Sequence, residues 1–418
     1  FGRRQDPFGA YAAVIPLFVK KFMAHFVLEG TLLDKKNGVP IVYATVGVEG
    51  TSIGSITNQA GEFRLHLADS LRRKSLVFSH VGYVAQKIDI PLLTAGQHFT
   101  LTLEPRIFPL QEVVIRVVHP IRLMREMLEK RMINYSQKPV YFTTFYREGV
   151  QYKQKFRSLT EAVFKIYKSP VQSLYAREQV KLLKMSRITD GLEQDTLIAR
   201  MSGGIDACLQ LDIINHLPDF LLADAHKDVY AYTSADVTIV GDHLVNVISF
   251  EQKKEVKEPL YCGELYIDSD NGALLQAQIR IHPRYMKQAT DMVVQRQARR
   301  MKIVLQELTY TISYKPWNGT YYINHVRGDL HFKVKQKRQW LGSSSLHTWF
   351  EMVTCKIDTV GVTRFQRNER IPTRTVFADT HFKYDSDFWE NFNVIPWEKQ
   401  LVEVIDQLTS KIEKIEYE

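Results

Sequence analysis

Short runs in which apolar and polar residues alternate, each closed by a turn sequence, fill the first quarter of the chain. In the run 62–67, Phe63, Leu65 and Leu67 fall on one side, which predicts a strand with one buried face. The sequence Asn-Gln-Ala-Gly at 58–61 predicts a tight turn before it, because Asn tolerates and Gly prefers the left-handed backbone. The whole pattern predicts a β-sandwich over residues 26–104, with strands at 26–33, 41–48, 52–57, 62–67, 75–80, 84–90 and 99–103.

A helical pattern replaces this alternation in residues 105–137, which we interpret as a linker with one helix. Pro120 suits the first helical position, where its missing N–H costs no hydrogen bond. One apolar stripe then runs along residues 120–134 and is expected to pack on a core. It consists of Ile121, Met124, Leu128 and Met132.

Longer alternating runs return in residues 138–385 and predict a larger antiparallel β-domain, shaped like half a barrel. Two Asn-Gly pairs, at 271–272 and 318–319, lie between such runs and predict tight hairpin turns. The second pair also fits an Asn-Gly-Thr glycosylation pattern, but the aromatic strand residues on both sides favour the turn. Long strands are expected at 159–167, 237–250, 261–267 and 273–281, with helical segments at 205–217 and 285–307.

Four large aromatic residues lie close together at the start of the C-terminal segment 386–418. Each can bury about 150–250 Å², and such a cluster exposed to water would favour aggregation, so we expect it to cover another surface. The favoured surface is the open face of the larger β-domain, and the alternative is a protein partner or a membrane. The aromatic residues are Phe388, Trp389, Phe392 and Trp397, followed by a predicted amphipathic helix at 398–415.

Several stretches of the first domain resemble the carboxypeptidase regulatory-like domain family. They are Leu-Glu-Gly-Thr-Leu-Leu-Asp at 28–34, Gly-Val-Pro at 38–40, Thr-Asn-Gln-Ala-Gly-Glu-Phe at 57–63 and His-Val-Gly-Tyr at 80–83. The resemblance implies a transthyretin-like, seven-stranded Greek-key sandwich, common in surface and periplasmic proteins of Gram-negative bacteria. It implies no peptidase activity, because that domain is an accessory to the zinc enzyme. The candidates for a structural or interaction role in it are Gly61, Phe63, Gly82 and Tyr83.

The rest of the chain is similar in pattern to the curved half-barrels of periplasmic lipoprotein carriers. It is also similar to a family of Gram-negative proteins that join the regulatory-like sandwich to such a β-rich region. In that family a Phe-Trp-x-x-Phe/Tyr-Asn-x-Ile segment precedes a final helix, and residues 388–395 match it. This similarity implies an envelope protein that is periplasmic or associated with the outer membrane.

The net charge of +9 does not by itself indicate a nucleic-acid partner, because 46 acidic residues are spread along the chain. In the basic run 333–338, lysines alternate with apolar residues such as Val334. This is the pattern of a half-buried strand with a solvated lysine face. We therefore predict that the protein has no nucleic-acid partner.

The residues with chemical potential do not form a recognisable catalytic set. Cys208, Cys262 and Cys355 lack metal-ligand spacing and imply no disulfide framework, although their redox state stays open. The zinc-peptidase pattern His-x-x-Glu does not occur, and neither does a Gly-rich phosphate loop. Asp268 and Asp270 are interpreted as turn residues. We predict no catalytic residue, no metal and no cofactor.

These observations favour a non-catalytic protein of the cell envelope that binds a protein partner, or an apolar ligand in the larger domain. One alternative is a subunit of an outer-membrane assembly or transport complex. Another is a hydrolase with its site in the larger β-domain. The apolar run at 11–18 is far shorter than a membrane span. Whether the N-terminus is a signal, an anchor or a truncated end stays open, and with it an attachment to the membrane.

Overall fold

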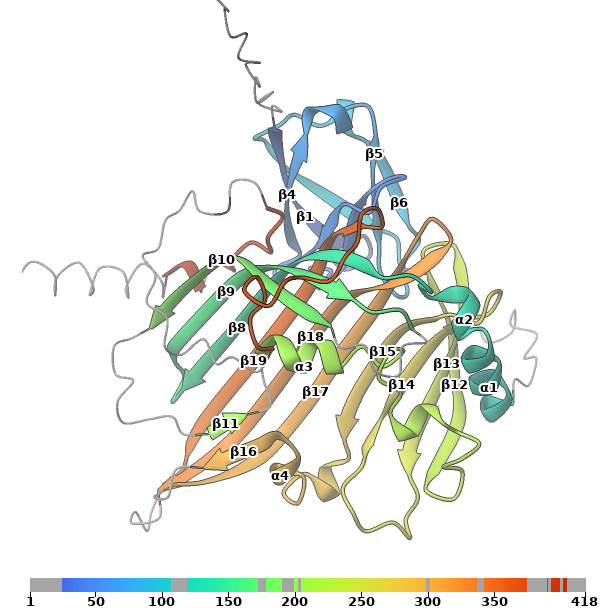
Figure 1. The fold of residues 1–418 in the computed structure, drawn as a ribbon, viewed down its shortest axis with the longest axis vertical. Helices are drawn as coiled ribbons and strands as arrows, with labels where there is room; N and C mark the ends of the chain where they lie inside the picture. The colour runs from blue at the N-terminus through green and yellow to red at the C-terminus, as the bar shows by residue number, and fades with distance from the viewer. Residues whose placement is uncertain are drawn as a thin grey trace, which may run out of the picture.

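The computed structural model describes residues 25–106, 119–171, 178–189, 199–201, 204–297, 301–336, 342–373, 389, 392–398 and 401–403. Strands dominate these ranges and form a small sandwich and one large sheet (Figure 1). This arrangement confirms the mainly β fold class expected from the alternating pattern. No helix within these ranges is long and apolar enough to cross a membrane.

The sandwich, blue in Figure 1, contains all seven predicted strands. They are β1 (His25–Asp34), β2 (Thr45–Val48), β3 (Gly54–Ile56), β4 (Glu62–Ala68), β5 (Ser75–Ser79), β6 (Gln86–Asp89) and β7 (His98–Leu103). One sheet has the order β4-β1-β7, with β1 and β7 parallel, and the other has the order β3-β2-β5-β6. Phe63 of the first sheet and Phe78 of the second meet edge to face in the shared core, with ring centroids 5.4 Å apart.

The turn at residues 58–61 is held by the side chain of Asn58. Its Oδ1 accepts hydrogen bonds from the backbone N–H groups of Ala60 (2.9 Å) and Glu62 (2.8 Å). Gly61 has a φ of +74°, and a Cβ atom added there would lie 2.5 Å from the carbonyl oxygen of Leu32. Any residue other than glycine is therefore strained at this position.

Replacing Gly61 with valine will lower the free energy of unfolding by about 1–3 kcal/mol, because the backbone is left-handed and the space is filled. Gly96→Val is the matched control, since Gly96 has a φ of +77° but nothing within 4 Å of its added Cβ. Urea unfolding of both variants separates backbone strain from the steric clash. An unchanged midpoint for Gly61→Val would contradict this account of the turn.

The large sheet is antiparallel throughout, and its strand order shows how the chain builds it. In order across the sheet, the strands are β10 (Gln179–Thr189), β9 (Lys155–Lys168), β8 (Val140–Tyr152), β19 (Ser344–Asp358), β18 (Thr320–Gln336), β17 (Met301–Trp317), β15 (Leu274–Ile281), β14 (Tyr261–Asp268), β13 (His243–Gln252) and β12 (Tyr230–Val240). The chain enters in the middle at β8, moves out to β10, crosses to β12 and returns to β19. A separate two-stranded sheet pairs β11 (Ala199–Met201) with β16 (Val294–Gln297).

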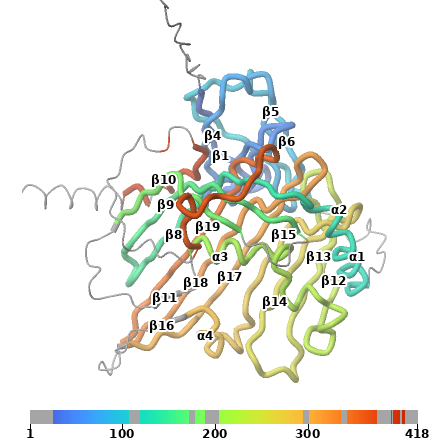
Figure 2. The backbone as a smooth tube through the Cα atoms, in the orientation of Figure 1, coloured from blue at the N-terminus to red at the C-terminus, as the bar shows by residue number. Residues whose placement is uncertain are grey.

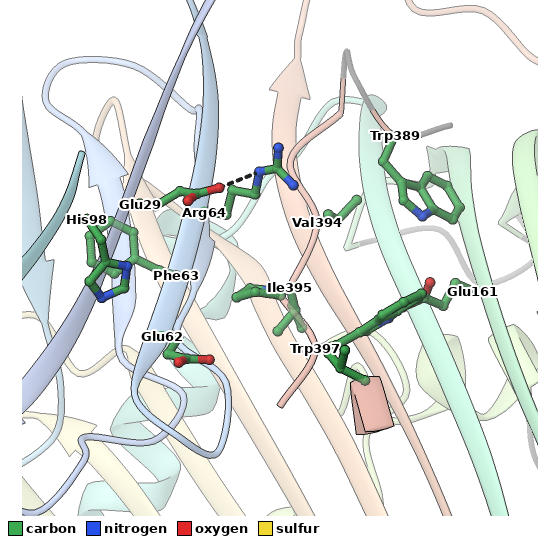
Figure 3. Close-up of a pocket in the computed structure, with 12 residues that line it drawn as sticks. Glu29, Glu62, Phe63, Arg64, His98, Glu161, Trp389, Val394, Ile395 and Trp397 are labelled. Carbon is green, nitrogen blue, oxygen red and sulfur yellow. Dashed lines mark hydrogen bonds and ion pairs between the residues drawn. The ribbon is translucent and has the colours of Figure 1, made fainter. Parts of the chain in front are cut away.

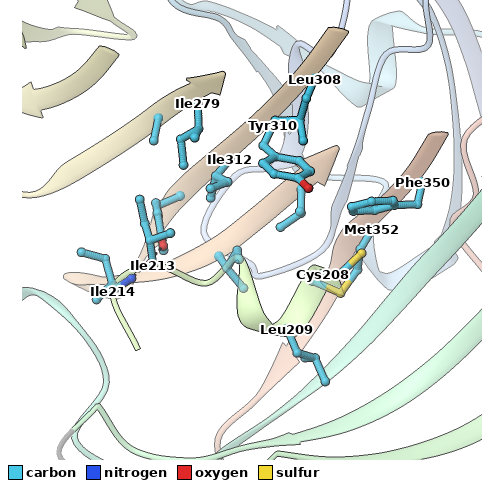
Figure 4. Packing of buried hydrophobic residues seen from close by; sticks show 14 of the residues in the cluster. Cys208, Leu209, Ile213, Ile214, Ile279, Leu308, Tyr310, Ile312, Phe350 and Met352 are labelled. Atoms are coloured by element: carbon cyan, nitrogen blue, oxygen red, sulfur yellow. Dashed lines mark hydrogen bonds between the residues drawn. The ribbon is translucent and has the colours of Figure 1, made fainter. Parts of the chain in front are cut away.

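One face of the large sheet carries the main hydrophobic core, which the helices cover. Side chains of α3 (Gly204–Gln210), such as Cys208, belong to the same cluster as Ile312 of β17 and Met352 of β19 (Figure 4). The helices α1 (Pro120–Glu129) and α2 (Arg131–Asn134) contribute Met124 and Met127 to it. Cys208, Cys262 and Cys355 are all buried free thiols.

The predicted helix at 120–134 has the expected ends, but it is not continuous and its buried face is partly wrong. It breaks into α1 and α2 at Lys130, so the apolar stripe does not continue. The buried residues of α1 are Leu123, Met124 and Met127, whereas Met132 is 37% exposed. The helix predicted at 205–217 is shorter as well, because α3 ends at Gln210.

Two further predictions in the larger domain are wrong. Residues 237–250 are not one strand, because the chain turns at Gly241, whose φ is +61°, and joins β12 to β13. Residues 285–307 are not mainly helical, since among those that the structure describes only α4 (Thr290–Val293) is an α-helix, followed by β16 and β17. A bulge between Leu305 and Glu307 shifts the alternation of β17 and imitates helical spacing. Both predicted Asn-Gly hairpin turns are present, between β14 and β15 and between β17 and β18.

The sandwich packs on the face of the large sheet opposite α3. Ser52 Oγ donates a hydrogen bond to the carbonyl of Ile357 (2.9 Å) and accepts one from its N–H (3.0 Å). Asn324 donates to Thr45 Oγ1 (3.0 Å), and the rings of Tyr43 and His325 lie 5.0 Å apart. The two bodies therefore share polar and aromatic contacts close to the central strands.

Candidate functional site: a cleft beside the C-terminal segment

A cavity of about 320 Å³, which we call the C-terminal cleft, lies where the sandwich, the large sheet and the C-terminal residues meet. Figure 3 shows Phe63 and His98 on the sandwich side, and Trp389, Val394 and Trp397 on the other. Figure 2 shows the C-terminal residues, in red, returning to this part of the molecule. The full lining is Glu29, Glu62, Phe63, Arg64, His98, Glu161, Trp389, Val394, Ile395, Pro396, Trp397 and Val402.

Beneath the cleft, four charged residues form a row across four neighbouring strands. Glu161 of β9, Arg147 of β8, Glu351 of β19 and Arg327 of β18 occupy directly opposite positions in the strand register. Arg147 Nε lies 2.7 Å from Glu161 Oε1, and Arg147 Nη1 lies 3.5 Å from Glu351 Oε1. Arg327 Nη1 lies 3.2 Å from Glu351 Oε2. Because acid and base alternate, every charge in this row has an opposite neighbour.

The charge row lowers the pKa of Glu351 although its side chain is buried. Burial alone would raise the pKa of Glu351, but His325, whose Nε2 lies 3.9 Å from Glu351 Oε2, and the charges of Arg327 and Arg147 bring it below its usual value. Asp329, beside Arg327, behaves similarly: burial opposes ionisation, while His347 and Arg327 lower its pKa to about 2. Burial lowers the pKa of His325.

The lowered pKa values predict a loss of stability in acid. A carboxyl group whose pKa is lower in the folded chain than in the unfolded chain stabilises the fold at any pH above its pKa in the unfolded chain. That contribution is lost as the pH falls through its pKa in the folded chain. We expect the urea midpoint to drop as the pH is lowered from about 5 to about 2, the pKa of Asp329 in the folded protein. The drop will be smaller in Glu351→Gln, which cannot titrate. Identical pH profiles for the two proteins would contradict this role of Glu351.

The C-terminal segment is fastened to the charge row by its backbone and one indole. Arg147 Nη2 donates to the carbonyl of Ile395, and Trp397 Nε1 donates to Glu161 Oε1 (2.6 Å). Trp389 packs edge to face on Phe145 of β8, with centroids 6.1 Å apart. Trp389, Phe145 and Ile395 belong to a second core, which is made of Ile56, Phe145, Val163, Val353, Cys355, Trp389, Val394 and Ile395.

The same segment also contacts the sandwich. The N–H of His66 donates to Asn393 Oδ1 (2.7 Å), and Asn58 Nδ2 donates to the carbonyl of Pro396 (3.3 Å). The segment therefore joins the two domains, on the sheet face opposite the one that α3 covers.

The structure brings together only some of the residues singled out from the sequence. Phe63, Trp389 and Trp397 line the C-terminal cleft, and Gly61 lies in the turn that precedes Phe63. Phe392 packs against the second core, and the centroid of its ring lies 5.8 Å from Lys184 Nζ. Phe388 lies outside the described residues, as does most of the predicted helix 398–415, of which residues 401–403 are helical.

Gly82 and Tyr83 lie away from the cleft. Tyr83 donates a hydrogen bond to Asp34 Oδ2 (2.8 Å), which supports the loop that begins at Asp34. The N–H of Gly82 donates to the carbonyl of Ile239 (2.8 Å), so this glycine contacts the far edge strand of the large sheet. An interaction role for these two residues stays a prediction.

Two features were not recognised in the sequence. The charge row gives no local signal, because its members are far apart and meet only through strand pairing. The sequence Gly-Thr-Ser-Ile-Gly at 50–54 fits the nucleophile pattern Gly-x-Ser-x-Gly, which needs a strand-to-helix turn. Here Ser52 lies between two strands, and its Oγ is occupied by the backbone of Ile357. Its role in this structure is therefore to join the two domains.

Within the described ranges, one group of side chains has the composition of a metal site. Ligand atoms of His243, Asp268 and Asp270 lie within 4.8 Å of one another. The Asp268 carboxylate, however, already accepts hydrogen bonds from the N–H groups of Asp270 (2.8 Å) and Asn271 (3.3 Å), and lies 2.8 Å from His243 Nδ1. A tight turn accounts for this cluster.

Comparison with known proteins identifies the first domain. Residues 28–115 match the family model of the CarboxypepD_reg-like domain, and a larger β region follows them in the chain. A search of curated proteins gave no match.

Solved structures show only a distant likeness. A putative outer membrane lipoprotein-sorting protein domain from Vibrio parahaemolyticus has 9% identity, covers 60% of this chain and 94% of its own, and gives a TM-score of 0.24. A DUF1329 family protein from Desulfovibrio piger has 11% identity, covers 59% of this chain and 96% of its own, and gives a TM-score of 0.24. A LolA superfamily protein from Nitrosomonas europaea has 10% identity, covers 55% of this chain and 92% of its own, and gives a TM-score of 0.21. TM-scores this low do not establish a common fold or function.

Proposed function

We propose that this protein is a non-catalytic binding protein of the cell envelope and that the C-terminal cleft binds an extended segment of a protein partner. The observation that carries the proposal is the convergence of Phe63, Trp389 and Trp397 on one small cavity. Aromatic side chains with a polar rim are typical of sites that anchor one or two side chains of a partner. The location in the envelope rests on the family of the sandwich domain.

The charged groups of the cleft support binding rather than catalysis. Glu161 accepts from both Arg147 and Trp397, and Glu29 pairs with Arg64 at 2.9 Å. Glu62 accepts from Asn58 Nδ2 at 3.1 Å. A general base needs a lone pair that can reach the substrate, whereas these carboxylates are held by donors of the protein itself.

The size of the cavity favours a peptide over a lipid. Small-molecule pockets span about 300–1,000 Å³, and the C-terminal cleft, at about 320 Å³, is at the lower limit. It accommodates a side chain or a short segment, not an acyl chain with its headgroup. The core side of the large sheet is packed with helix side chains (Figure 4).

Site-specific photo-crosslinking tests the proposal. A photoreactive residue at Val402, which lines the cleft and is 38% exposed, is expected to form an adduct with an envelope protein of a Gram-negative host. The same residue at Val360, 88% exposed and outside the cleft, is the control. Equal adducts at both positions, or none at Val402, would reject the cleft as the binding site. Chelator-sensitive cleavage of peptides by the purified protein would reject the non-catalytic assignment.

A further inference from the structure

A second cavity, of about 480 Å³, lies at the opposite end of β10 from the C-terminal cleft and is rich in arginine. We call it the arginine pocket. Three of its lining residues are Arg364, Arg367 and Arg370, in the segment that follows β19, and the Arg364 guanidinium carbon lies 5.9 Å from the centre of the Tyr167 ring. The remaining lining is Glu178, Gln179, Ile371, Pro372 and Thr373.

The segment that carries the three arginines is firmly attached to the sheet. At its start, Thr363 accepts and donates backbone hydrogen bonds with the hydroxyl of Tyr141, and Phe365 stacks on the Tyr141 ring at 5.3 Å. At its end, the N–H of Ile371 donates to the carbonyl of Val180 (2.8 Å). Between them, Glu369 is bound to Lys181 at 2.6 Å. The arginines therefore extend from an ordered backbone fixed at both ends.

The arginines have no acidic partner in the part of the chain that the structure describes, since none of its ion pairs includes Arg364, Arg367 or Arg370. The single acid of the lining, Glu178, is already engaged by Lys168 at 2.6 Å, and His216 lies 3.6 Å from it. Burial opposes the ionisation of Glu178, but Lys168 and His216 hold its pKa far below the usual value. The pocket thus keeps a strong positive charge.

We propose that the arginine pocket binds a phosphate group. A guanidinium group can donate two parallel N–H bonds to a phosphate, so three arginines lining one cavity suit an anion with several oxygens. The volume exceeds that of phosphate alone, so the pocket also admits a phosphate carried on a larger molecule, such as a lipid headgroup. The site is separate from the C-terminal cleft and does not depend on the proposed function.

The test compares two sources of phosphate on the full chain at low salt. Inorganic phosphate is titrated by calorimetry, and vesicles of phosphatidylglycerol in phosphatidylcholine are tested by flotation against phosphatidylcholine alone. The variant is Arg364→Gln, Arg367→Gln and Arg370→Gln together. The control removes the same charge from exposed residues elsewhere, as Lys36→Gln, Arg73→Gln and Lys254→Gln. Arg370→Gln alone keeps the test valid if the triple variant fails to fold.

We expect binding to weaken about tenfold or more in the arginine variant and to stay unchanged in the control, because charge-assisted bidentate bonds are lost only in the first. If this pattern holds with inorganic phosphate, a free phosphate is sufficient. If it holds only with phosphatidylglycerol vesicles, the ligand is an anionic headgroup. Absence of binding to both probes, or an equal loss in the control, overturns the proposal.

Discussion

Replacement of Arg147 with methionine is expected to lower the free energy of unfolding by about 3–5 kcal/mol, the cost of leaving buried charges without their partner. Arg147 is only 1% exposed, and its removal leaves Glu161 and Glu351 on either side of β8 without a cation between them. The carbonyl of Ile395 loses its donor as well. Urea unfolding at neutral pH measures the effect.

Two further variants show whether this loss comes from the charge row. Lys35→Met removes an exposed ion pair with Glu104, and we expect a loss below about 1 kcal/mol. Adding Glu161→Gln and Glu351→Gln to Arg147→Met removes the uncompensated charges and is expected to recover part of the stability. A loss in Arg147→Met as small as in Lys35→Met would show that the row is not an energetic unit.

Removal of residues 386–418 is expected to lower the unfolding temperature and to create a surface that binds a hydrophobic dye. The truncation uncovers Phe145, Val163 and Val353, which pack under the C-terminal segment. Truncating a buried tryptophan to alanine costs about 3–5 kcal/mol in other proteins, so Trp389→Ala alone should show the same direction of change. Differential scanning calorimetry and dye fluorescence measure the two effects.

Trp397→Phe provides the matched control for the truncation. It keeps an aromatic ring but loses the hydrogen bond to Glu161, so it tests the polar attachment without uncovering the apolar surface. We expect a modest loss of stability and no new dye binding. If the truncated protein keeps both its unfolding temperature and its low dye binding, the segment does not stabilise the sheet. The aromatic residues would then be expected to pack on a protein partner or a membrane.

The sandwich could be predicted from the sequence because its information is local. Each strand alternates over a few residues, and a turn with a specific backbone requirement, such as that at Gly61, ends it. The larger sheet was predicted less well where the local signal is altered. The bulge at Leu305 in β17 disturbs the alternation of apolar and polar residues. The turn at Gly241 lies between two alternating runs that together resemble a single strand.

The candidate site was only half visible in the sequence for a related reason. The aromatic residues Trp389 and Trp397 could be recognised because they cluster in a short segment. Arg147, Glu161 and Glu351 could not, because a charged residue on a strand normally faces water and only the strand register reveals that these three are opposite one another. Pairing between distant strands is set by the tertiary fold and leaves no local pattern.

The order of strands in the large sheet has a consequence for how the protein folds. Strands β8 to β10 and strands β12 to β19 are each connected through local hairpins or short excursions, but β8 and β19 pair across about half of the chain. Closing a loop of that length is entropically costly and slow. We therefore expect the two sets of strands to form first and the seam between β8 and β19 to close last. Until β19 (Ser344–Asp358) pairs with β8, the nascent chain has two unpaired sheet edges in addition to those of β10 and β12, and such edges tend to pair with other chains.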